Sequence, residues 1–193
     1  MIYSAENFPT SFTAADGTEY SIHSDFREWI RFESLITNAD VPENLKFFIA
    51  LRLIFADIVP EDFHAAHEFI GWFYRGGKEL PDDKENSGGI ALTSRRVYDY
   101  EYDSDYIFAA FMEQYGIDLS EIPYLHWWKF LALFKGLHDC KMTDIMGYRG
   151  AEITDDLPDS RKAFLMDMQE LFELPVSLTE QRRIEAARKF LEG

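Results

Sequence analysis

The chain is poor in cysteine. Cys140 is the single cysteine among 193 residues, so the chain cannot form an internal disulfide or a cluster of thiolate metal ligands. Its neighbours His138 and Lys141 would activate an exposed thiol modestly, but no base can be assigned to it from the sequence. This cysteine usage is typical of a reducing compartment and predicts a cytoplasmic protein.

Long apolar runs are missing as well. No stretch approaches the 18 or so uncharged apolar residues that a membrane span requires, and the opening MIYSAENFPTSF lacks the basic and apolar regions of a signal peptide. We therefore expect the protein to stay in the cytoplasm of the cell that makes it.

Positive charge is scarce. The chain has 19 Lys and Arg against 35 Asp and Glu, a net charge of -16 and a pI near 4.6. Such a charge repels phosphate backbones and anionic lipid headgroups, which excludes nucleic acid and membrane surfaces as favoured partners. A basic or hydrophobic protein partner fits better, and the charge keeps the molecule soluble.

The motifs of common enzyme classes are also lacking. There is no P-loop, no GxGxxG and no GxSxG. His64 and His67 share one helical face close to Glu61 and Asp62, but the HExxH order and a third ligand are missing. The sequence therefore predicts no catalytic residue, no metal and no cofactor. A small metal-dependent enzyme that uses the two histidines is the last-ranked alternative.

Aromatic residues, in contrast, are abundant. The 17 Phe, 10 Tyr and 4 Trp make up 16% of the chain. This large apolar area needs to be packed, either in an unusually aromatic core or beneath a partner. The length suits one domain, and we expect a single mostly helical domain over residues 1–193.

The hydrophobic periodicity predicts a mainly α fold, a compact domain of six to eight helices with a small N-terminal β-hairpin. Asp16-Gly17 suits the turn of that hairpin, which spans residues 11–24. Residues 76–92 are rich in glycine and charge and predict an acidic linker. We expect helices over about residues 25–38, 42–56, 60–75, 104–115, 118–137, 158–174 and 177–191, with a helical turn near 143–148.

The same periodicity predicts which residues face inward, and Ser24 is the expected N-cap of the first helix. The expected inward residues are Phe26, Trp29, Ile30, Glu33 and Ile36 in the first helix, Leu45, Phe48, Ile49, Arg52, Leu53 and Ala56 in the second, Phe63, Ala66, Ile70 and Phe73 in the third, and Phe164, Met168, Leu171 and Phe172 in the helix near 158–174.

Tyrosine alternates with acidic residues from Tyr98 to Asp103, a pattern that predicts an extended segment with two different faces over residues 97–103. A calcium loop is disfavoured because the central glycine and the closing bidentate glutamate of an EF-hand are missing. The remaining interpretations are a solvated strand face, which is favoured, and an acidic recognition edge.

An aromatic cluster lies on the expected helix 118–137, beside His126. Such clusters occur at interface hot spots, but on a helix that is apolar almost all round they are more often core. Successive residues point about 100° apart, so at most one side of the cluster would face a partner. His126 is expected to be a core histidine rather than a catalytic base. The cluster consists of Trp127, Trp128, Phe130 and Phe134.

Two stretches carry a family resemblance: DGTEYSIHSDFREWIRFESLI at 16–36 and YDYEYDSDYIFAAFMEQYGIDLSEIPYLHWWKFLALFKGL at 98–137, with a weaker IMGYR at 145–149. The chain resembles the gene product fifteen family of tailed phages and prophages of Gram-positive bacteria, found in the tail-morphogenesis region. The resemblance implies a non-enzymatic tail assembly chaperone that binds the tape-measure protein in the cytoplasm of the bacterial host. The alternative is a structural tail subunit that stays in the virion.

If the protein is such a chaperone, its client is a long, aggregation-prone helical protein, and an acidic shell around an aromatic groove would suit it. We hypothesise that the aromatic cluster supplies part of this groove, with an acidic rim made by Asp99, Glu101, Asp103 and Asp105. The expected C-terminal helix carries a basic patch that favours self-association, formed by Arg182, Arg183, Arg188 and Lys189.

Overall fold

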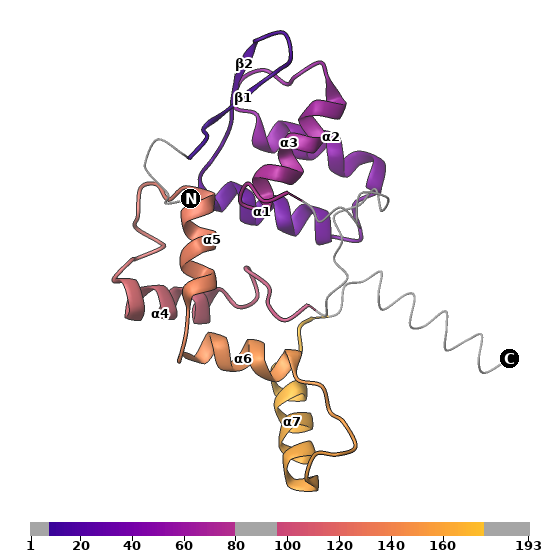
Figure 1. Cartoon of the computed structure of the whole chain (residues 1–193), viewed down its shortest axis with the longest axis vertical. Coiled ribbons are helices and arrows are strands. Elements are labelled where there is room, and N and C mark those ends of the chain that lie inside the picture. The colour runs from indigo at the N-terminus through magenta and orange to yellow at the C-terminus, as the bar shows by residue number, and fades with distance from the viewer. Residues whose placement is uncertain (1–7, 80–95, 176–193) are drawn as a thin grey trace, which may run out of the picture. The chain divides into compact units, whose positions relative to one another are not determined.

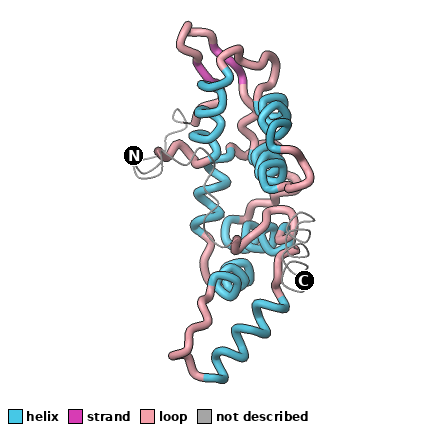
Figure 2. Tube along the Cα trace, turned by 90° about the vertical axis from the view of Figure 1, so that its right-hand side faces the viewer, coloured by secondary structure: helices cyan, strands magenta, loops and turns pink. Residues whose placement is uncertain are grey.

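The structure is a computed structural model that describes residues 8–79 and 96–175. Within these ranges it has seven helices and one two-stranded hairpin, which confirms the mainly α prediction (Figures 1 and 2). Most of the expected linker and the expected helix 177–191 lie outside the described residues. The elements are β1 (Ser11–Thr13), β2 (Glu19–Ser21), α1 (Phe26–Thr37), α2 (Glu43–Ile54), α3 (Phe63–Tyr74), α4 (Ser104–Tyr115), α5 (Trp127–Gly136), α6 (Lys141–Gly150) and α7 (Asp159–Leu171).

The described residues form two compact units. Unit 1 contains residues 8–79 and 124–131, and unit 2 contains residues 96–123 and 132–175. Helix α5 contributes its residues up to Leu131 to unit 1 and its residues from Ala132 to unit 2. Cooperative unfolding as one domain stays a prediction.

The N-terminal hairpin in unit 1 follows the predicted turn. Gly17 has a φ of 86°, a left-handed conformation that glycine adopts without steric cost. The Asp16 carboxylate accepts a hydrogen bond from the Thr18 amide at 2.9 Å, which fixes the turn. The two strands pair antiparallel, with Phe12 opposite Tyr20.

Helix α1 is capped by Asp25, and the predicted cap Ser24 is wrong. The Asp25 carboxylate accepts hydrogen bonds from the Arg27 amide at 3.0 Å and the Leu125 amide at 2.9 Å. The Phe26 amide donates to the Leu125 carbonyl at 2.9 Å, so backbone pairing to a segment distant in sequence fixes where the helix begins. The Ser24 hydroxyl instead shares a hydrogen bond with the Tyr124 hydroxyl at 2.8 Å.

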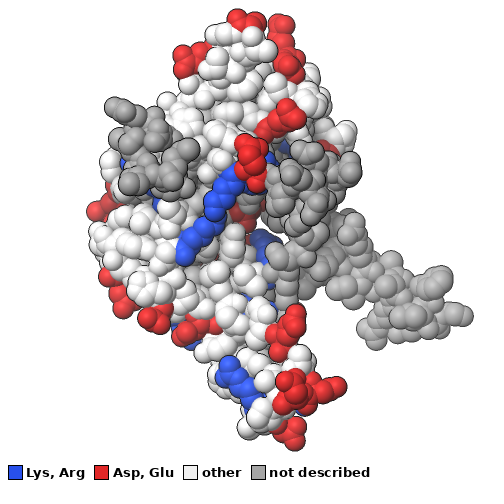
Figure 3. All heavy atoms as spheres, in the orientation of Figure 1, with Lys and Arg blue, Asp and Glu red and all other residues white. Residues whose placement is uncertain are grey.

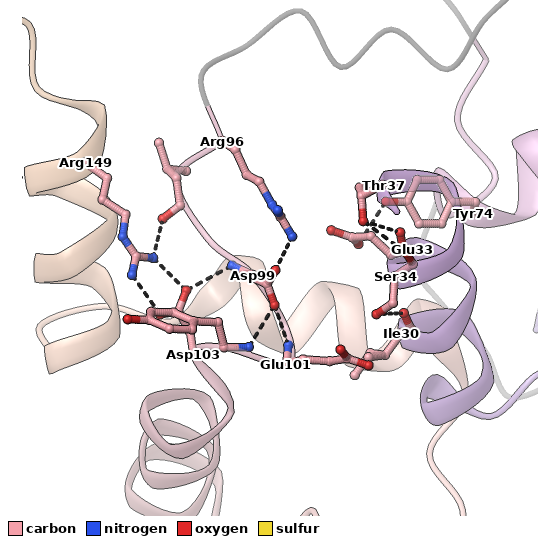
Figure 4. A network of polar contacts seen from close by, with 12 residues as sticks. Ile30, Glu33, Ser34, Thr37, Tyr74, Arg96, Asp99, Glu101, Asp103 and Arg149 are labelled. Atoms are coloured by element: carbon pink, nitrogen blue, oxygen red, sulfur yellow. Dashed lines mark hydrogen bonds and ion pairs between the residues drawn. The ribbon is translucent and has the colours of Figure 1, made fainter. Parts of the chain in front are cut away.

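The buried face of α1 matches the prediction only in part. Phe26, Trp29 and Glu33 are buried as expected, whereas Phe32 replaces Ile30 and Ile36 as the third apolar core residue. The buried Glu33 carboxylate accepts a hydrogen bond from the Tyr74 hydroxyl at 2.9 Å (Figure 4). This bond compensates for removing the carboxylate from water.

Helix α2 turns the opposite face inward from the one predicted. The residues buried in α2 are Lys46, Ala50, Leu51 and Ile54, whereas Leu45, Phe48 and Ile49 are exposed. Both faces of this helix are apolar, so periodicity alone cannot select between them. The buried Lys46 ammonium donates to the Ile36 carbonyl at 2.8 Å and to the Glu43 carboxylate at 2.6 Å, contacts that only the tertiary fold provides.

Helix α3 is predicted better. Ala66, Ile70 and Phe73 are buried as expected, and the wrong member of the set is Phe63, in the first turn, which is exposed. Asp62 caps the helix, since its carboxylate accepts from the amides of residues 64 and 65. After the helix, Gly76 and Gly77 both have a φ of 74°, as a glycine stop requires.

In unit 2, the predicted extended segment 97–103 is wrong. The Asp99 carboxylate accepts hydrogen bonds from the Glu101 and Tyr102 amides, each at 2.8 Å, and the Asp103 amide donates to the Asp99 carbonyl at 2.9 Å. An aspartate that bonds to the backbone two and three residues onward favours a turn over a strand. Residues 100–103 therefore form a turn that leads into α4, and this helix stops at Gly116 as predicted.

The remaining helices depart from their predicted bounds or faces. Helix α5 begins at Trp127 instead of near Asp118, because the Asp118 carboxylate closes a turn with Ser120. Helix α6 is longer than the expected turn. In α7 only Leu165 is buried, and the prediction that Phe164 and Leu171 face inward is wrong.

His126 stands directly before α5 in unit 1 and is buried, as expected of a core histidine. Its Nδ1 accepts a hydrogen bond from the Trp128 amide at 3.0 Å, so Nε2 carries the proton and donates to the Pro9 carbonyl at 3.0 Å. Burial lowers the pKa of His126 below its ordinary value of 6.5; the bond to Pro9 opposes this effect and the charge of Lys129 adds to it.

We predict a pH dependence of stability from this histidine. The unfolded chain binds the proton more readily than the folded chain, so the stabilisation is complete above about pH 6.5 and is lost as the pH falls toward the lowered folded pKa. Between pH 7.5 and 5.5, the free energy of unfolding should fall less in His126→Asn, whose side chain can still cap α5, than in the native chain. Urea unfolding at several pH values across this range measures the free energy of unfolding.

His64→Asn, which replaces an exposed histidine, is the control. If the free energy of unfolding fell equally with pH in His126→Asn and in the native chain, the pH dependence would not come from His126.

Within residues 8–79 and 96–175, no helix is both long and apolar enough to cross a membrane.

Candidate protein-binding surface

Three of the four aromatic residues proposed for a groove form the core of unit 1. Trp127 is fully buried, stacks on Tyr74 with ring centroids 5.8 Å apart, and donates from its indole nitrogen to the Tyr74 carbonyl at 2.9 Å. Trp128 donates in the same way to the Phe73 carbonyl at 2.8 Å. Phe130, also fully buried, stacks on a phenylalanine of α1 at 4.9 Å.

The fourth aromatic, Phe134, belongs to unit 2. It is buried, and its ring lies 5.1 Å from that of Tyr98 and 5.2 Å from that of Tyr100. The structure therefore divides the cluster between two units and buries every member. These side chains do not form an exposed groove, and any contact they make with a partner stays a prediction.

The four carboxylates proposed as a rim are also separated. Asp103 is completely buried and forms a two-point ion pair with Arg149 of α6, at 2.6 and 2.9 Å (Figure 4). Asp99 is half-buried and pairs with Arg96. Only Glu101 and Asp105 are exposed. Asp103 thus supports the fold, and the four do not form one continuous acidic edge.

The two histidines considered for a metal site point to different partners. The His64 ring nitrogen lies 3.6 Å from the Glu68 carboxylate, and the His67 ring packs edge-on against Phe47 with centroids 5.5 Å apart. In the described part of the chain, no three His, Cys, Asp or Glu side chains converge as a metal site would require. The Cys140 thiol is buried beside the Thr143 hydroxyl, 3.7 Å away.

Sequence reasoning missed an exposed apolar surface on unit 1, which we call the α2–α3 surface. It combines the outward face of α2 with the loop that leads into α3. The rings of Phe48 and Phe63 meet edge to face with centroids 6.1 Å apart, and Phe48 is 54% exposed. The large apolar side chains exposed here are Leu45, Phe48, Ile49, Ile58 and Phe63.

A shallow depression of about 370 Å³ lies in this surface, bounded by α2 on one side and the start of α3 on the other. Apolar side chains dominate its lining, and Arg52 and Glu61 supply the charges. The lining residues are Phe48, Leu51, Arg52, Val59, Pro60, Glu61 and Phe63.

Acidic residues dominate the surroundings of the α2–α3 surface. The exposed carboxylates on α2, α3 and the loop between them are Glu43, Asp57, Glu61, Asp62 and Glu68. Arg52 is the one exposed Lys or Arg in the same stretch of described residues, because Lys46 is buried. Red acidic spheres are likewise spread over the face of the molecule in Figure 3, whereas blue spheres gather in a few places.

One sequence signal could have pointed to this surface. Residues 43–54 read ENLKFFIALRLI, with apolar residues on both faces of a helix. A helix of this kind is either buried all round or has a second apolar face available to a partner. Helix α7 also exposes apolar side chains, Met166 and Leu171.

Comparison with known proteins identifies a protein family that matches most of the chain. The family model described as bacteriophage Gp15 protein matches residues 6–174. No curated protein matches the chain, and no solved structure matches it. The matched range includes all the helices and strands named above.

Proposed function

Because the chain belongs to the bacteriophage Gp15 protein family and is therefore phage-related, we propose that it is a non-enzymatic tail assembly chaperone that binds the tape-measure protein. Membership of the family confirms the resemblance read from the sequence. The tail-specific role goes further, and it rests on that resemblance together with the properties of the surface.

The observation that carries the proposal is the α2–α3 surface on a strongly acidic chain. A monomeric soluble protein rarely exposes several large apolar side chains side by side unless they bind something. Here five such side chains occupy α2, the start of α3 and the loop between them, in a molecule of net charge -16. Apolar contacts would cover an aggregation-prone client, while the charge would keep the complex in solution.

Co-expression with the tape-measure protein encoded nearby tests the proposal. We expect the tape measure to become soluble and to co-purify with this chain in a fixed ratio, which the mass of the complex measures. A tape measure that stays insoluble and does not co-purify would contradict it.

Finished particles provide the second readout. A chaperone leaves before the tail is complete, so we expect mass spectrometry of purified virions to detect the tape measure without this chain. Detection at fixed copy number would instead support a structural tail subunit.

A further inference from the structure

We propose that the α2–α3 surface is the client-binding site and that its ligand is an amphipathic helix with basic residues flanking its apolar stripe. The proposal rests on the proposed function, because it names the kind of client segment that the chain binds. It also makes a claim about unit 1 that can be tested without the tape-measure protein.

The shape of the surface favours a helix as the ligand. Leu45, Phe48 and Ile49 follow the i, i+3, i+4 spacing of a stripe along one helix, and Arg52 continues it. A stripe of this kind presents a ridge and groove that accept the side chains of a second helix packed across it. The adjoining depression beside Phe63 gives room for one large anchoring side chain.

The charge of the surroundings specifies the flanks of the ligand. Five exposed carboxylates and a single exposed arginine lie on the described segment that forms the surface. Lys or Arg residues beside the apolar stripe of a ligand would therefore be attracted, and Asp or Glu at the same places would be repelled. Since these charges are exposed, the preference should weaken as salt rises.

The apolar side chains of the surface are about half exposed, which makes them suitable for mutation. Leu45, Phe48, Ile49 and Phe63 are each between 45% and 54% exposed, so shortening one of them leaves no large cavity. Met166 on α7, in unit 2, is 61% exposed and provides a matched control. Far-UV circular dichroism of every variant checks that the fold is retained.

The test uses the full chain and a designed peptide of about 18 residues, roughly five helical turns, with Leu and Ala on one face and Lys along both flanks. A second peptide has each Lys replaced by Glu. We expect the basic peptide to bind one-to-one by calorimetry, and the acidic peptide to bind at least about tenfold more weakly at low salt. Phe48→Ser and Phe63→Ser should each weaken the basic peptide roughly tenfold, whereas Met166→Ser should leave its affinity unchanged.

Charge reversal provides an independent arm. Glu61→Lys, which changes the depression without touching its apolar lining, should reduce the preference for the basic peptide. Equal binding of both peptides by the native chain would overturn the charge argument. An equal loss from Met166→Ser and Phe48→Ser would overturn the location.

Two other occupants of the surface would also overturn the proposal. If the chain without peptide is a dimer that Phe48→Ser converts to a monomer, the occupant is a second copy. If the basic peptide binds only after residues 177–193 are removed, the occupant is the basic C-terminal segment of the chain itself.

The outcome is separable from that of the proposed function. Binding of the peptide without co-purification of the tape measure would leave the surface in place and contradict the chaperone role. Co-purification that Phe48→Ser and Phe63→Ser do not reduce would retain the role and remove this surface from it.

Discussion

Replacing Asp103 with asparagine is expected to lower the free energy of unfolding by roughly 3–5 kcal/mol. The Asp103 side chain is fully buried, and the Arg149 side chain that it pairs with is 5% exposed. An asparagine of nearly the same shape removes the negative charge and leaves the guanidinium without a counter-charge in the interior, which is the costly way to break a buried ion pair. A domain of this size has a total stability of only about 5–15 kcal/mol, so the loss is large.

The position of Arg149 explains why so much depends on one pair. Besides Asp103, its guanidinium donates to the Val97 carbonyl at 3.1 Å and to the Phe172 carbonyl at 2.6 Å. A single side chain on α6 thereby holds the segment before α4 and the residue that follows α7. Loss of Asp103 would weaken the contacts that position several elements of unit 2.

Urea unfolding measures this effect. Asp105→Asn is the control, because Asp105 lies two residues after Asp103, in the first turn of α4, and is exposed. We expect the control to change stability by less than about 1 kcal/mol. The double variant Asp103→Asn with Arg149→Met should cost less than the sum of the two single changes, since it also removes the unpaired charge. Equal urea midpoints for the Asp103 and Asp105 variants would contradict the prediction.

The same experiment tests whether the chain unfolds as one domain. All 4 tryptophans, Trp29, Trp72, Trp127 and Trp128, belong to unit 1, whereas Asp103 belongs to unit 2. If the units unfold together, Asp103→Asn shifts the transitions seen by tryptophan fluorescence and by circular dichroism equally. If they unfold separately, the fluorescence transition keeps its midpoint and the dichroism signal divides into two steps.

Replacing Trp127 with alanine is the second change with a large expected effect, a loss of roughly 3–5 kcal/mol. The indole is fully buried and stacks between aromatic rings, with centroids 6.3 Å from Trp29 and 5.7 Å from Phe130. Its removal leaves a cavity that close-packed neighbours refill only partly, and it leaves the Tyr74 carbonyl without its 2.9 Å hydrogen bond.

Phe48→Ala is the control for Trp127→Ala, because it truncates an exposed aromatic side chain of the α2–α3 surface instead of a core residue. Phe48 is about half exposed, so we expect its truncation to cost less than about 1 kcal/mol. Thermal unfolding of the two variants should therefore differ strongly. If Trp127→Ala unfolded at the same temperature as the native chain, Trp127 would not be a core residue that stabilises unit 1. A loss of client binding in Trp127→Ala alone would reflect an unstable fold rather than a lost contact.

The sequence by itself determined the local features of this protein. Gly17 and Gly116 adopt positive φ values, which few other residues do. The turn of the hairpin and the end of α4 therefore lie at the positions that these glycines predict. Helical periodicity located most helices, because a single apolar face with a stop signal, as in α3, leaves little ambiguity. The quoted stretches also sufficed to identify the family that the match over residues 6–174 confirms.

Only the tertiary structure decided which faces are buried and which residues can meet a partner. Helix α2 is apolar on both sides, and the choice between them depends on contacts such as that of Lys46 with the Ile36 carbonyl. The Asp103 carboxylate looks like a surface charge until Arg149, distant in sequence, is placed beside it. Local propensity contains no information about such distant partners. For this reason the sequence pointed to the aromatic cluster of α5, which the structure buries, and missed the exposed apolar side chains of α2 and α3.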